Sequence, residues 1–320
     1  MEKFFVSALD LDKKNDKDKD HAKRIIEVTG DQAVDIAIDT IHMNKQALIF
    51  VSTRNSAEAL AERIAKSCVS RGIVNSNSKE SGGLEELSKK ILSVLSSPTK
   101  QCKRLSRCIL GGVAFHHSGL PAMQRELVEN AFREGVIRII VATPTLAYGL
   151  NLPAFRVVVR DLKRYNPSWG YVWIPTLEYL QFIGRAGRPG LEEYGEAIAI
   201  ASSENEREKI LKRYIYGYPE EITSKLAAEP VFRTYLLAAI SSGYANTMDE
   251  LNALFLSTFH AYSYGDINAL ESNIARAINS LVSWGFIVLD GEKLKPTRIG
   301  KRVSELYLDC LLYTSPSPRD

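Results

Sequence analysis

Residues 181–190 read Gln-Phe-Ile-Gly-Arg-Ala-Gly-Arg-Pro-Gly and place Arg185 and Arg188 three positions apart between glycines. A hydrophobic run precedes them, and the strand-like run Glu-Ala-Ile-Ala-Ile-Ala follows at 196–201. An arginine stays protonated and donates several hydrogen bonds from a planar fork, so it can stabilise charge on a transferring phosphoryl group. The pattern predicts an arginine finger and hydrolysis of a nucleoside triphosphate. Taken alone, the same string is also typical of a basic turn whose glycines end a helix.

Three blocks upstream extend this pattern. They are Ala-Leu-Ile-Phe-Val-Ser-Thr-Arg at 47–54, Val-Ala-Phe-His-His-Ser-Gly-Leu-Pro-Ala at 113–122 and Val-Ala-Thr-Pro-Thr-Leu-Ala-Tyr-Gly-Leu-Asn-Leu-Pro-Ala at 141–154. In this order and spacing, the four blocks closely resemble motifs IV, IVa, V and VI of the Ski2-like group of superfamily 2 helicases. The nearest match is the archaeal Holliday-junction-migration (Hjm) ATP-dependent DNA helicases. The resemblance runs from about residue 47 to about residue 309.

The bulk composition is that of an ordinary globular protein. The 320 residues are enough for two domains, with 25% charged and 45% hydrophobic residues. A net charge of +3 is too small to indicate nucleic acid by itself, so any basic surface must be local. The 4 cysteines show no paired spacing, which favours a reduced protein without structural zinc. No apolar run long enough for a membrane span and no signal-peptide pattern occur, so we expect a cytoplasmic protein without a membrane partner.

Apolar runs that alternate with helical patterns predict an α/β domain. Each run is almost entirely apolar, as in parallel strands that are buried on both faces of a sheet. The expected strands are 47–51, 136–142, 155–160 and 196–201. Asn55 is expected to cap the helix after the first strand. The predicted fold is a RecA-like parallel-sheet domain of the P-loop NTPase type, followed by a helical winged-helix domain.

The winged helix is predicted from the pattern beyond residue 219. Apolar residues recur there at helical spacing, and a hairpin with its turn at Asp290-Gly291 follows. In the resembling helicases this domain mainly braces the motor, and an independent DNA reader is the alternative. The predicted organisation is a mostly flexible lead-in with a charged loop (1–30), a second RecA-like helicase domain (31–217), the winged helix (218–296), the start of a truncated helical ratchet domain (297–309) and a non-native tail (310–320).

The resemblance implies that motif VI contacts the nucleotide. Arg185 and Arg188 would approach the γ-phosphate of ATP, with Arg188 as the finger. Gln181 would help to sense the nucleotide, and Gly184 belongs to the same nucleotide-binding turn. These roles need a partner domain that holds the phosphate.

Motif V is expected to serve two ligands. Thr143 would contact a phosphate of the nucleic acid, while Gly149 and Asn151 would face the ribose of the nucleotide. In the plainer alternative, Thr143 only caps and Asn151 only makes a turn.

Motifs IV and IVa supply candidates for the nucleic-acid track. The motif IV residues follow the carboxyl end of a strand, the usual ligand side of an open α/β sheet, although Arg54 is equally compatible with a plain surface charge. The motif IVa residues stand beside a helix start, where backbone amides attract phosphate. No metal site is expected, because the adjacent His116 and His117 point to opposite faces of an extended segment. The candidates are Ser52, Thr53, Arg54, His117, Ser118 and Gly119.

A basic and aromatic stretch separates motifs V and VI. Residues 160–175 flank an Asn-Pro-Ser-Trp-Gly turn and look like the strand-separating hairpin of the family. Aromatic rings can stack on an unpaired base, at roughly 1–3 kcal/mol each. Tyr165, Trp169 and Tyr171 are the candidates, with core packing of at least one as the alternative.

Neither a GxxxxGK[ST] phosphate loop nor a DExH or DEAD box occurs in the sequence. In the resembling helicases both belong to a first RecA-like domain, which would hold ATP and supply the Mg²⁺ ligands. The chain is therefore interpreted as the carboxyl-side half of a motor, and ATP hydrolysis by this chain alone is not expected.

The resemblance implies a fragment of an ATP-dependent 3′-to-5′ DNA helicase that acts in DNA repair and at replication forks. Its expected partners are single-stranded and forked DNA and the absent first RecA-like and ratchet domains, and the expected state is a monomer. A Ski2-like RNA helicase is one alternative, since 2′-hydroxyl recognition cannot be read from these residues. The alternative of another class is a non-catalytic module that binds single strands.

Overall fold

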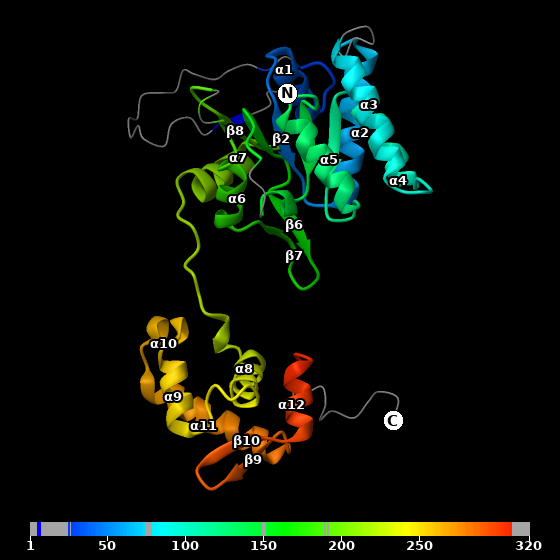
Figure 1. The fold of residues 1–320 in the computed structure, drawn as a ribbon. Helices are drawn as coiled ribbons and strands as arrows, with labels where there is room; N and C mark the ends of the chain where they lie inside the picture. Colours follow the sequence, from blue (N-terminus) through cyan, green and yellow to red (C-terminus); the bar gives the residue numbers. More distant parts are fainter. Residues whose placement is uncertain are drawn as a thin grey trace. The chain divides into compact units, whose positions relative to one another are not determined.

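The computed structural model describes residues 5–7, 25, 27–73, 79–148, 152–188, 190 and 192–308. The chain divides into two compact units, Met1–Glu220 and Glu221–Asp320 (Figure 1). Unit 1 is built on a six-stranded sheet, and unit 2 consists of helices and a hairpin.

The strands of the unit 1 sheet run parallel, as the sequence predicted, except for one antiparallel strand at the edge. The order across the sheet is β1-β8-β5-β2-β4-β3. In the middle, Ala47 lies beside Ile139 on one side and Arg156 on the other. The strands are β1 (Phe5–Ser7), β2 (Ala47–Phe50), β3 (Val113–His116), β4 (Ile139–Ala142), β5 (Arg156–Val159) and β8 (Glu196–Ile200).

The edge strand β1 lies within residues 1–30, for which the sequence predicted a mostly flexible lead-in. It pairs antiparallel with β8, with Val6 opposite Ala199. A strand of 3 residues is too short to show a periodic pattern, so it could not be identified from the sequence. The predicted charged loop at 10–24 lies outside the described residues.

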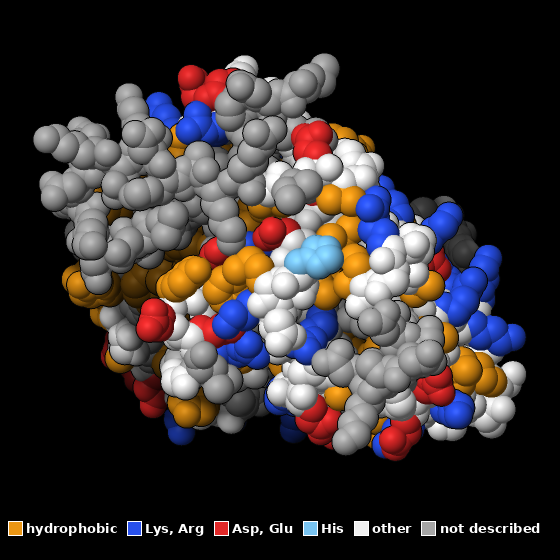
Figure 2. Space-filling view, turned by 90° about the horizontal axis from the view of Figure 1, so that it is seen from above, with side chains coloured by type: hydrophobic (Ala, Val, Ile, Leu, Met, Phe, Trp, Pro, Cys, Tyr) orange, Lys and Arg blue, Asp and Glu red, His pale blue; other side chains and the backbone are white. Residues whose placement is uncertain are grey.

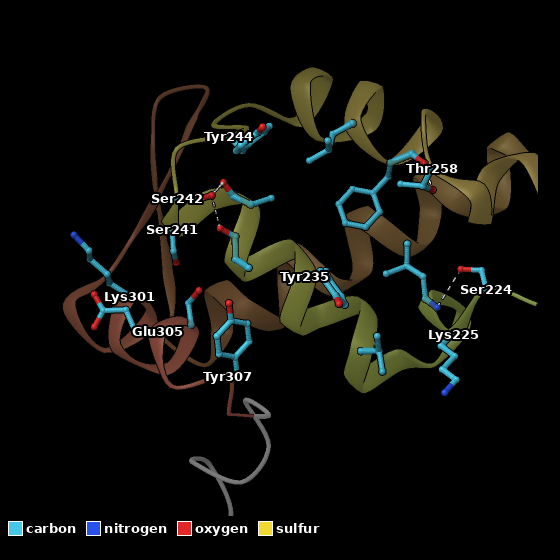
Figure 3. A pocket seen from close by; sticks show the side chains of 17 residues that line it. Ser224, Lys225, Tyr235, Ser241, Ser242, Tyr244, Thr258, Lys301, Glu305 and Tyr307 are labelled. Carbon is cyan, nitrogen blue, oxygen red and sulfur yellow. Dashed lines mark hydrogen bonds between the residues drawn. The ribbon is translucent and has the colours of Figure 1, made fainter. Parts of the chain in front are cut away.

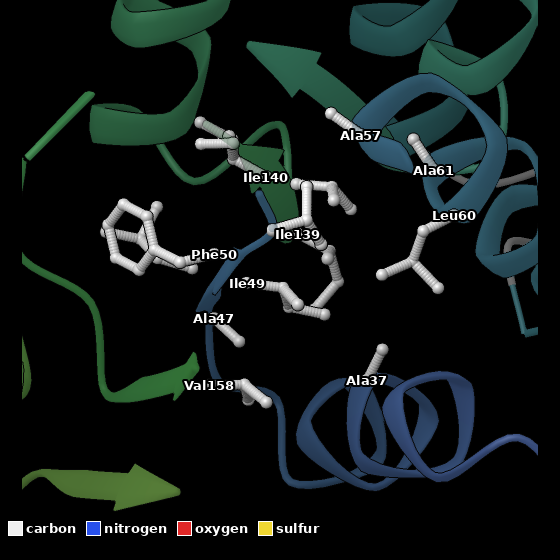
Figure 4. Packing of buried hydrophobic residues seen from close by; sticks show 14 of the residues in the cluster. Ala37, Ala47, Ile49, Phe50, Ala57, Leu60, Ala61, Ile139, Ile140 and Val158 are labelled. Atoms are coloured by element: carbon white, nitrogen blue, oxygen red, sulfur yellow. The ribbon is translucent and has the colours of Figure 1, made fainter. Parts of the chain in front are cut away.

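Helices cover both faces of this sheet. Alternate residues of a strand point to opposite faces, so the wholly buried β2 needs cover on both sides. On one face Ile49 points toward Leu60 and Ala37 (Figure 4). On the other, the ring of Phe50 stacks on that of Phe182, with centroids 4.4 Å apart. The helices of unit 1 are α1 (Gln32–His42), α2 (Arg54–Ser70), α3 (Lys79–Ser93), α4 (Lys100–Ile109), α5 (Ala122–Arg133), the 3₁₀ turn η1 (Pro144–Leu146), α6 (Thr176–Ile183), α7 (Glu204–Ile210) and the π-helical turn η2 (Leu211–Ile215).

The helix after β2 begins earlier than predicted, because Thr53 and not Asn55 is its N-cap. Thr53 has extended backbone angles (φ −130°, ψ 155°), and its hydroxyl accepts the N–H of Ser56. Asn55 lies inside the first turn. The chain thus turns from strand to helix within a few residues, and Arg54 becomes the first helical residue.

A fully buried arginine, Arg156, ties the start of β5 to its neighbours. Its Nη1 donates to Asp39 Oδ2 at 2.8 Å and to Thr40 Oγ1 at 2.7 Å, and its Nε donates to Glu196 Oε2 at 2.7 Å. The side chain is 0% exposed. A buried charge is tolerated only when it is paired and hydrogen-bonded, and here two carboxylates do this from α1 and β8.

Unit 2 packs its helices around a hairpin, the arrangement expected of a winged helix. Leu236, Leu281 and Phe286 are fully buried in its core. The hairpin turns at Gly291, which has φ +62°, and Lys293 pairs with Asp290. The elements are η3 (Lys225–Ala227), α8 (Glu229–Ser241), α9 (Met248–Leu256), α10 (Phe259–Tyr264), α11 (Ile267–Ser283), β9 (Ile287–Asp290), β10 (Lys293–Pro296) and α12 (Arg298–Glu305).

The end of unit 2 covers the predicted start of a ratchet domain at 297–309. Here α12 packs against α8 and β10 of the same unit. A Cβ on Gly300 would lie 2.0 Å from the carbonyl oxygen of Phe286, so the helix approaches the hairpin closely. The predicted tail at 310–320 lies outside the described residues.

Replacing Arg156 with Met should lower the free energy of unfolding of unit 1 by about 3 kcal/mol or more, because it removes the buried cation that pairs with the carboxylates of Asp39 and Glu196. The measurement is urea unfolding followed by tryptophan fluorescence in a Trp284→Phe background, where Trp169 and Trp173 report on unit 1. Lys90→Met is the matched control, since Lys90 and Glu86 form an exposed pair worth about 0–1 kcal/mol. Equal losses in the two variants would contradict a special role for Arg156.

Candidate functional site

The parallel direction of the strands sorts the predicted site residues onto two edges of the unit 1 sheet. The candidates of motifs IV and IVa and Thr143 directly follow β2, β3 and β4, so they lie at the carboxyl edge. The turn with Arg185 and Arg188 lies at the amino edge, because the carbonyl of Arg185 accepts the N–H of Ala154, just before β5. Strands of 4 residues separate these edges, a length of about 13 Å.

The carboxyl edge presents a polar surface formed by two neighbouring turns. Arg54 Nη2 donates to Ser118 Oγ at 2.9 Å, and both side chains are exposed. The backbone N–H and the hydroxyl of Ser52 both donate to Asp161 Oδ2, at 2.9 and 3.1 Å. Ser52 is thus held by a carboxylate, whereas Arg54 and Ser118 are exposed and bond each other, which leaves both side chains open to a phosphate from solvent.

His117 lies beneath this surface. Its Nδ1 accepts the N–H of Gly119 at 3.1 Å, and its Nε2 lies 3.2 Å from Glu58 Oε1, so the ring is the tautomer with its proton on Nε2. The ring is 0% exposed. Burial lowers the pKa of His117, and the hydrogen bond to Glu58 only partly offsets this. The ring is thus placed to hold the turn of Ser118 and Gly119.

The neighbouring His116 points the other way, toward Glu129. Its Nε2 lies 2.8 Å from Glu129 Oε1. Burial lowers the pKa of His116 despite that carboxylate. Within the described residues no group of three or more His, Cys, Asp or Glu side chains could hold a metal ion.

Glu58 joins the turn of His117 to two helices, and the sequence analysis missed it. It accepts from Gln101 Nε2 at 2.6 Å and forms an ion pair with Arg104, which also bonds Glu62 through Nε at 2.7 Å. Glu58 and Glu62 stand four residues apart on α2, a spacing that places both on one face of the helix and could have indicated a basic partner.

Thr143 directly follows β4 and is buried. Its hydroxyl lies 2.9 Å from that of Thr145, and its N–H donates to the carbonyl of His116 at 3.2 Å. Gly149 and Asn151, the predicted ribose contacts, lie outside the described residues.

The predicted hairpin is present, as β6 (Lys163–Asn166) and β7 (Gly170–Trp173). The three candidate rings are exposed, by 66% for Tyr165, 81% for Trp169 and 76% for Tyr171. Tyr165 and Tyr171 face each other across the strands, edge to face, with centroids 5.7 Å apart. None of the three packs in the core, whereas Trp173 of the same hairpin packs against Tyr214.

At the amino edge, both arginines of motif VI donate hydrogen bonds within the chain. Arg185 Nη2 donates to the carbonyl of Ala147 at 2.7 Å, which ties motif VI to the loop after Thr143. Gln181 is exposed in the last turn of α6, and Gly184 ends that helix.

Arg188 is held by two residues that the sequence analysis missed. Its Nη1 donates to Gln46 Oε1 at 2.5 Å, and its Nη2 donates to Glu192 Oε1 at 2.7 Å. Lys45 Nζ lies 3.4 Å from the same carboxylate oxygen. Burial would raise the pKa of Glu192, but the bonds from Arg188 and Lys45 outweigh it and lower the pKa.

A close backbone approach fixes the turn that carries Arg188. Gly187 has φ +90°, and its N–H donates to the carbonyl of Ala154 at 2.7 Å. A Cβ on Gly195 would lie 2.2 Å from the nitrogen of Gly187. Both glycines are therefore required by geometry, one by its conformation and the other by contact.

Two further surface features were not predicted from the motifs, a set of basic side chains and a groove in unit 2. On the face seen in Figure 2, Lys and Arg side chains gather in groups among hydrophobic ones. A groove of about 1110 Å³ lies within unit 2, between α8, α9 and α12, and Tyr235 and Tyr307 line it (Figure 3). None of the predicted site residues lines this groove.

An open parallel sheet with paired arginines at one edge and polar turns at the other is the arrangement of a RecA-like α/β domain. Residues 80–190 match the family described as the helicase conserved C-terminal domain. The chain is 40% identical over 292 residues to the ATP-dependent DNA helicase Hel308 of Methanocella arvoryzae, an alignment that covers 90% of this chain and 38% of the relative.

Two further relatives carry the same name. The protein of Pyrobaculum calidifontis is 39% identical over 91% of this chain and 40% of its own length, and that of Pyrococcus horikoshii is 39% identical over 86% and 37%. The predicted resemblance to archaeal Ski2-like superfamily 2 helicases is thus supported over most of the chain, which spans about two fifths of the length of these relatives. No helix in the described part of the chain is long and apolar enough to cross a membrane.

The stability of unit 1 should fall as the pH is lowered from 7.5 to 5.5. The folded state lowers the pKa of His116 and His117 below 6.5, so the unfolded chain binds protons first. This contribution is complete above pH 6.5 and is lost as the pH falls toward the lower, folded pKa values. Urea midpoints across this range would measure it, and His117→Asn should make the profile shallower. Parallel profiles for the two proteins would refute the assignment.

Proposed function

We propose that the chain forms the second RecA-like domain and the winged helix of an ATP-dependent DNA helicase that moves 3′ to 5′ and acts in repair and at replication forks. The observation that carries this proposal is the hydrogen bond from Arg185 to the carbonyl of Ala147. It connects the arginines at one edge to the loop that starts at Thr143 on the other edge. Such a connection would let a change at the nucleotide reach the strand.

The amino edge fits a triphosphate bound by another domain. Arg188 has a buried Nε–H with no hydrogen-bond partner in the described part of the chain, a donor that would reach a phosphate oxygen once the side chain moves. When bound, ATP would supply the phosphoryl group, and a first RecA-like domain would supply the Mg²⁺ ligands. Arg185, Gln181 and Gly184 would complete this side, together with Gly149 and Asn151.

The carboxyl edge fits a strand of nucleic acid. Arg54 and Ser118 would bind a backbone phosphate at the start of α2, where backbone N–H groups also point outward. Ser52, Thr53 and Thr143 would shape the track, and His117 would hold the turn of Gly119 in place. The exposed rings of Tyr165, Trp169 and Tyr171 would stack on bases where the duplex opens.

The same proposal covers the rest of the assembly. The boundaries 31–217 and 218–296 would separate the motor domain from the winged helix, and a ratchet domain would follow. The protein would act as a cytoplasmic monomer on single-stranded and forked DNA. The names of the relatives, ATP-dependent DNA helicases, support the DNA track over an RNA track.

Arg188→Ala in the full-length protein should lower ATP hydrolysis at least about a hundredfold, because the finger stabilises transition-state charge. Binding of single-stranded DNA should be nearly unchanged, since Arg188 lies at the opposite edge. Steady-state hydrolysis and fluorescence anisotropy measure the two effects, with Arg302→Ala in unit 2 as the control. Unchanged turnover would show that the finger assignment is wrong.

Changing both Trp169 and Tyr171 to Ala should slow unwinding of a forked duplex more than strand-stimulated hydrolysis, because the rings act only where base pairs part. The expected loss of unwinding is about tenfold or more, from two stacking contacts of roughly 1–3 kcal/mol each. Tyr262→Ala, an exposed ring of unit 2, is the control. Equal loss of both activities would argue that the rings support the motor instead.

These assays also separate the alternatives. An RNA helicase would unwind a forked RNA in preference to the matching DNA. A non-catalytic module would bind single strands with the same affinity in wild type and Arg188→Ala, and neither protein would hydrolyse ATP.

A further inference from the structure

The position of Arg188 suggests that the proposed finger starts from a withdrawn state. Its side chain is 23% exposed, and its guanidinium bonds Gln46 and Glu192 at the same time. Both bonds use Nη atoms, which a bidentate contact to phosphate would also use. Arg188 must therefore leave at least one of these partners before it can bind a phosphate through both.

Gln46 is a fixed acceptor for this arginine. Its Nε2 donates to the carbonyls of Phe132 at 2.6 Å and Ile137 at 2.8 Å, so the amide cannot turn. Its Oε1 consequently faces Arg188. The residue is 2% exposed, so this acceptor is prepared by the fold before any ligand arrives.

Glu192 is a charged acceptor that lies beside two cations, Arg188 and Lys45. Its side chain is 2% exposed, and the same Oε1 lies 2.7 Å from Arg188 and 3.4 Å from Lys45. A buried carboxylate left without a cation would be costly. Because Lys45 stays beside it, Glu192 keeps a countercharge when Arg188 departs.

We propose that Glu192 is a positioning residue that retains Arg188 in a withdrawn state, and that Lys45 neutralises Glu192 when Arg188 moves to the nucleotide. We call Arg188, Gln46, Glu192 and Lys45 the arginine latch. The inference rests on the proposed function, because it requires Arg188 to act on a phosphoryl group. It adds a regulatory step, in which hydrolysis is restrained until the strand and the partner domain draw Arg188 out.

Glu192→Gln in the full-length protein tests the latch. The amide preserves the shape and a hydrogen bond but removes the charge, so release becomes easier. We expect hydrolysis without DNA to rise about fivefold, the difference between a charged and a neutral hydrogen bond. The rate with saturating single-stranded DNA should stay near wild type, so stimulation by DNA should fall by the same factor. Glu193→Gln, at the exposed neighbouring position, is the matched control, and Glu192→Asp should restore wild-type stimulation.

Lys45→Met gives a second, opposite readout. Without the countercharge, release of Arg188 leaves Glu192 unpaired, so kcat should fall about fivefold with little change in KM. Thermal melting checks that each variant is folded. If Glu192→Gln does not fold, the kcat of Lys45→Met alone tests the latch. An unchanged or lower DNA-independent rate in folded Glu192→Gln, or an unchanged kcat in Lys45→Met, would overturn the latch.

Arg188→Ala in the same assays separates the two proposals. Full hydrolysis by Arg188→Ala would overturn the finger assignment and the latch with it. Loss of hydrolysis in Arg188→Ala, without a gain in Glu192→Gln, would overturn the latch alone.

Discussion

The common direction of the parallel strands in unit 1 determines which loops can meet. Every turn that leaves β2, β3 or β4 emerges at the carboxyl edge, and every segment that enters β2 or β5 arrives at the amino edge. Motifs distant in sequence are thereby gathered without needing contacts of their own. Buried Arg156 secures the amino edge, because it links α1, β5 and β8 through Asp39 and Glu196. The positions of Lys45, Gln46 and Arg188 all depend on that edge.

Because the predicted site residues lie at two opposite edges, any coupling between them requires a physical link. The segment after Thr143 supplies one, since it starts at the carboxyl edge and ends at Ala154, which pairs with the motif VI turn. Helix α6 supplies another, because it runs from the end of the hairpin to the same turn. A helix with an attachment at each end is the kind of structure through which energetic coupling passes. The fold therefore places both links on the arginine-bearing turn.

The sequence predicted the fold more fully than it predicted the contacts within the site. Wholly apolar runs such as 47–51 identify parallel strands, because burial on both faces leaves no place for polar residues. The hairpin with its turn at Asp290-Gly291 could be predicted because glycine is typical of such turns. Pairings between residues far apart in the sequence could not be predicted. Gln46 and Glu192, for example, match no sequence motif, and only the folded structure shows that both bond Arg188. The contacts of Glu58 could not be predicted for the same reason. Strand β1 could not be predicted because it is too short to show a periodic pattern. His117 matched its motif, yet only the structure shows its ring buried.

The contact between Gly187 and Gly195 has a consequence for how this region can change over generations. Any substitution of a glycine adds at least a Cβ atom, and at position 195 that atom would fall on the opposing backbone. A movement of neighbouring side chains cannot make room for that atom, because the obstacle is main chain. The usual engineering route to a more rigid loop, glycine to alanine, is likewise closed at this point. The turn can be remodelled only by altering both backbone segments together.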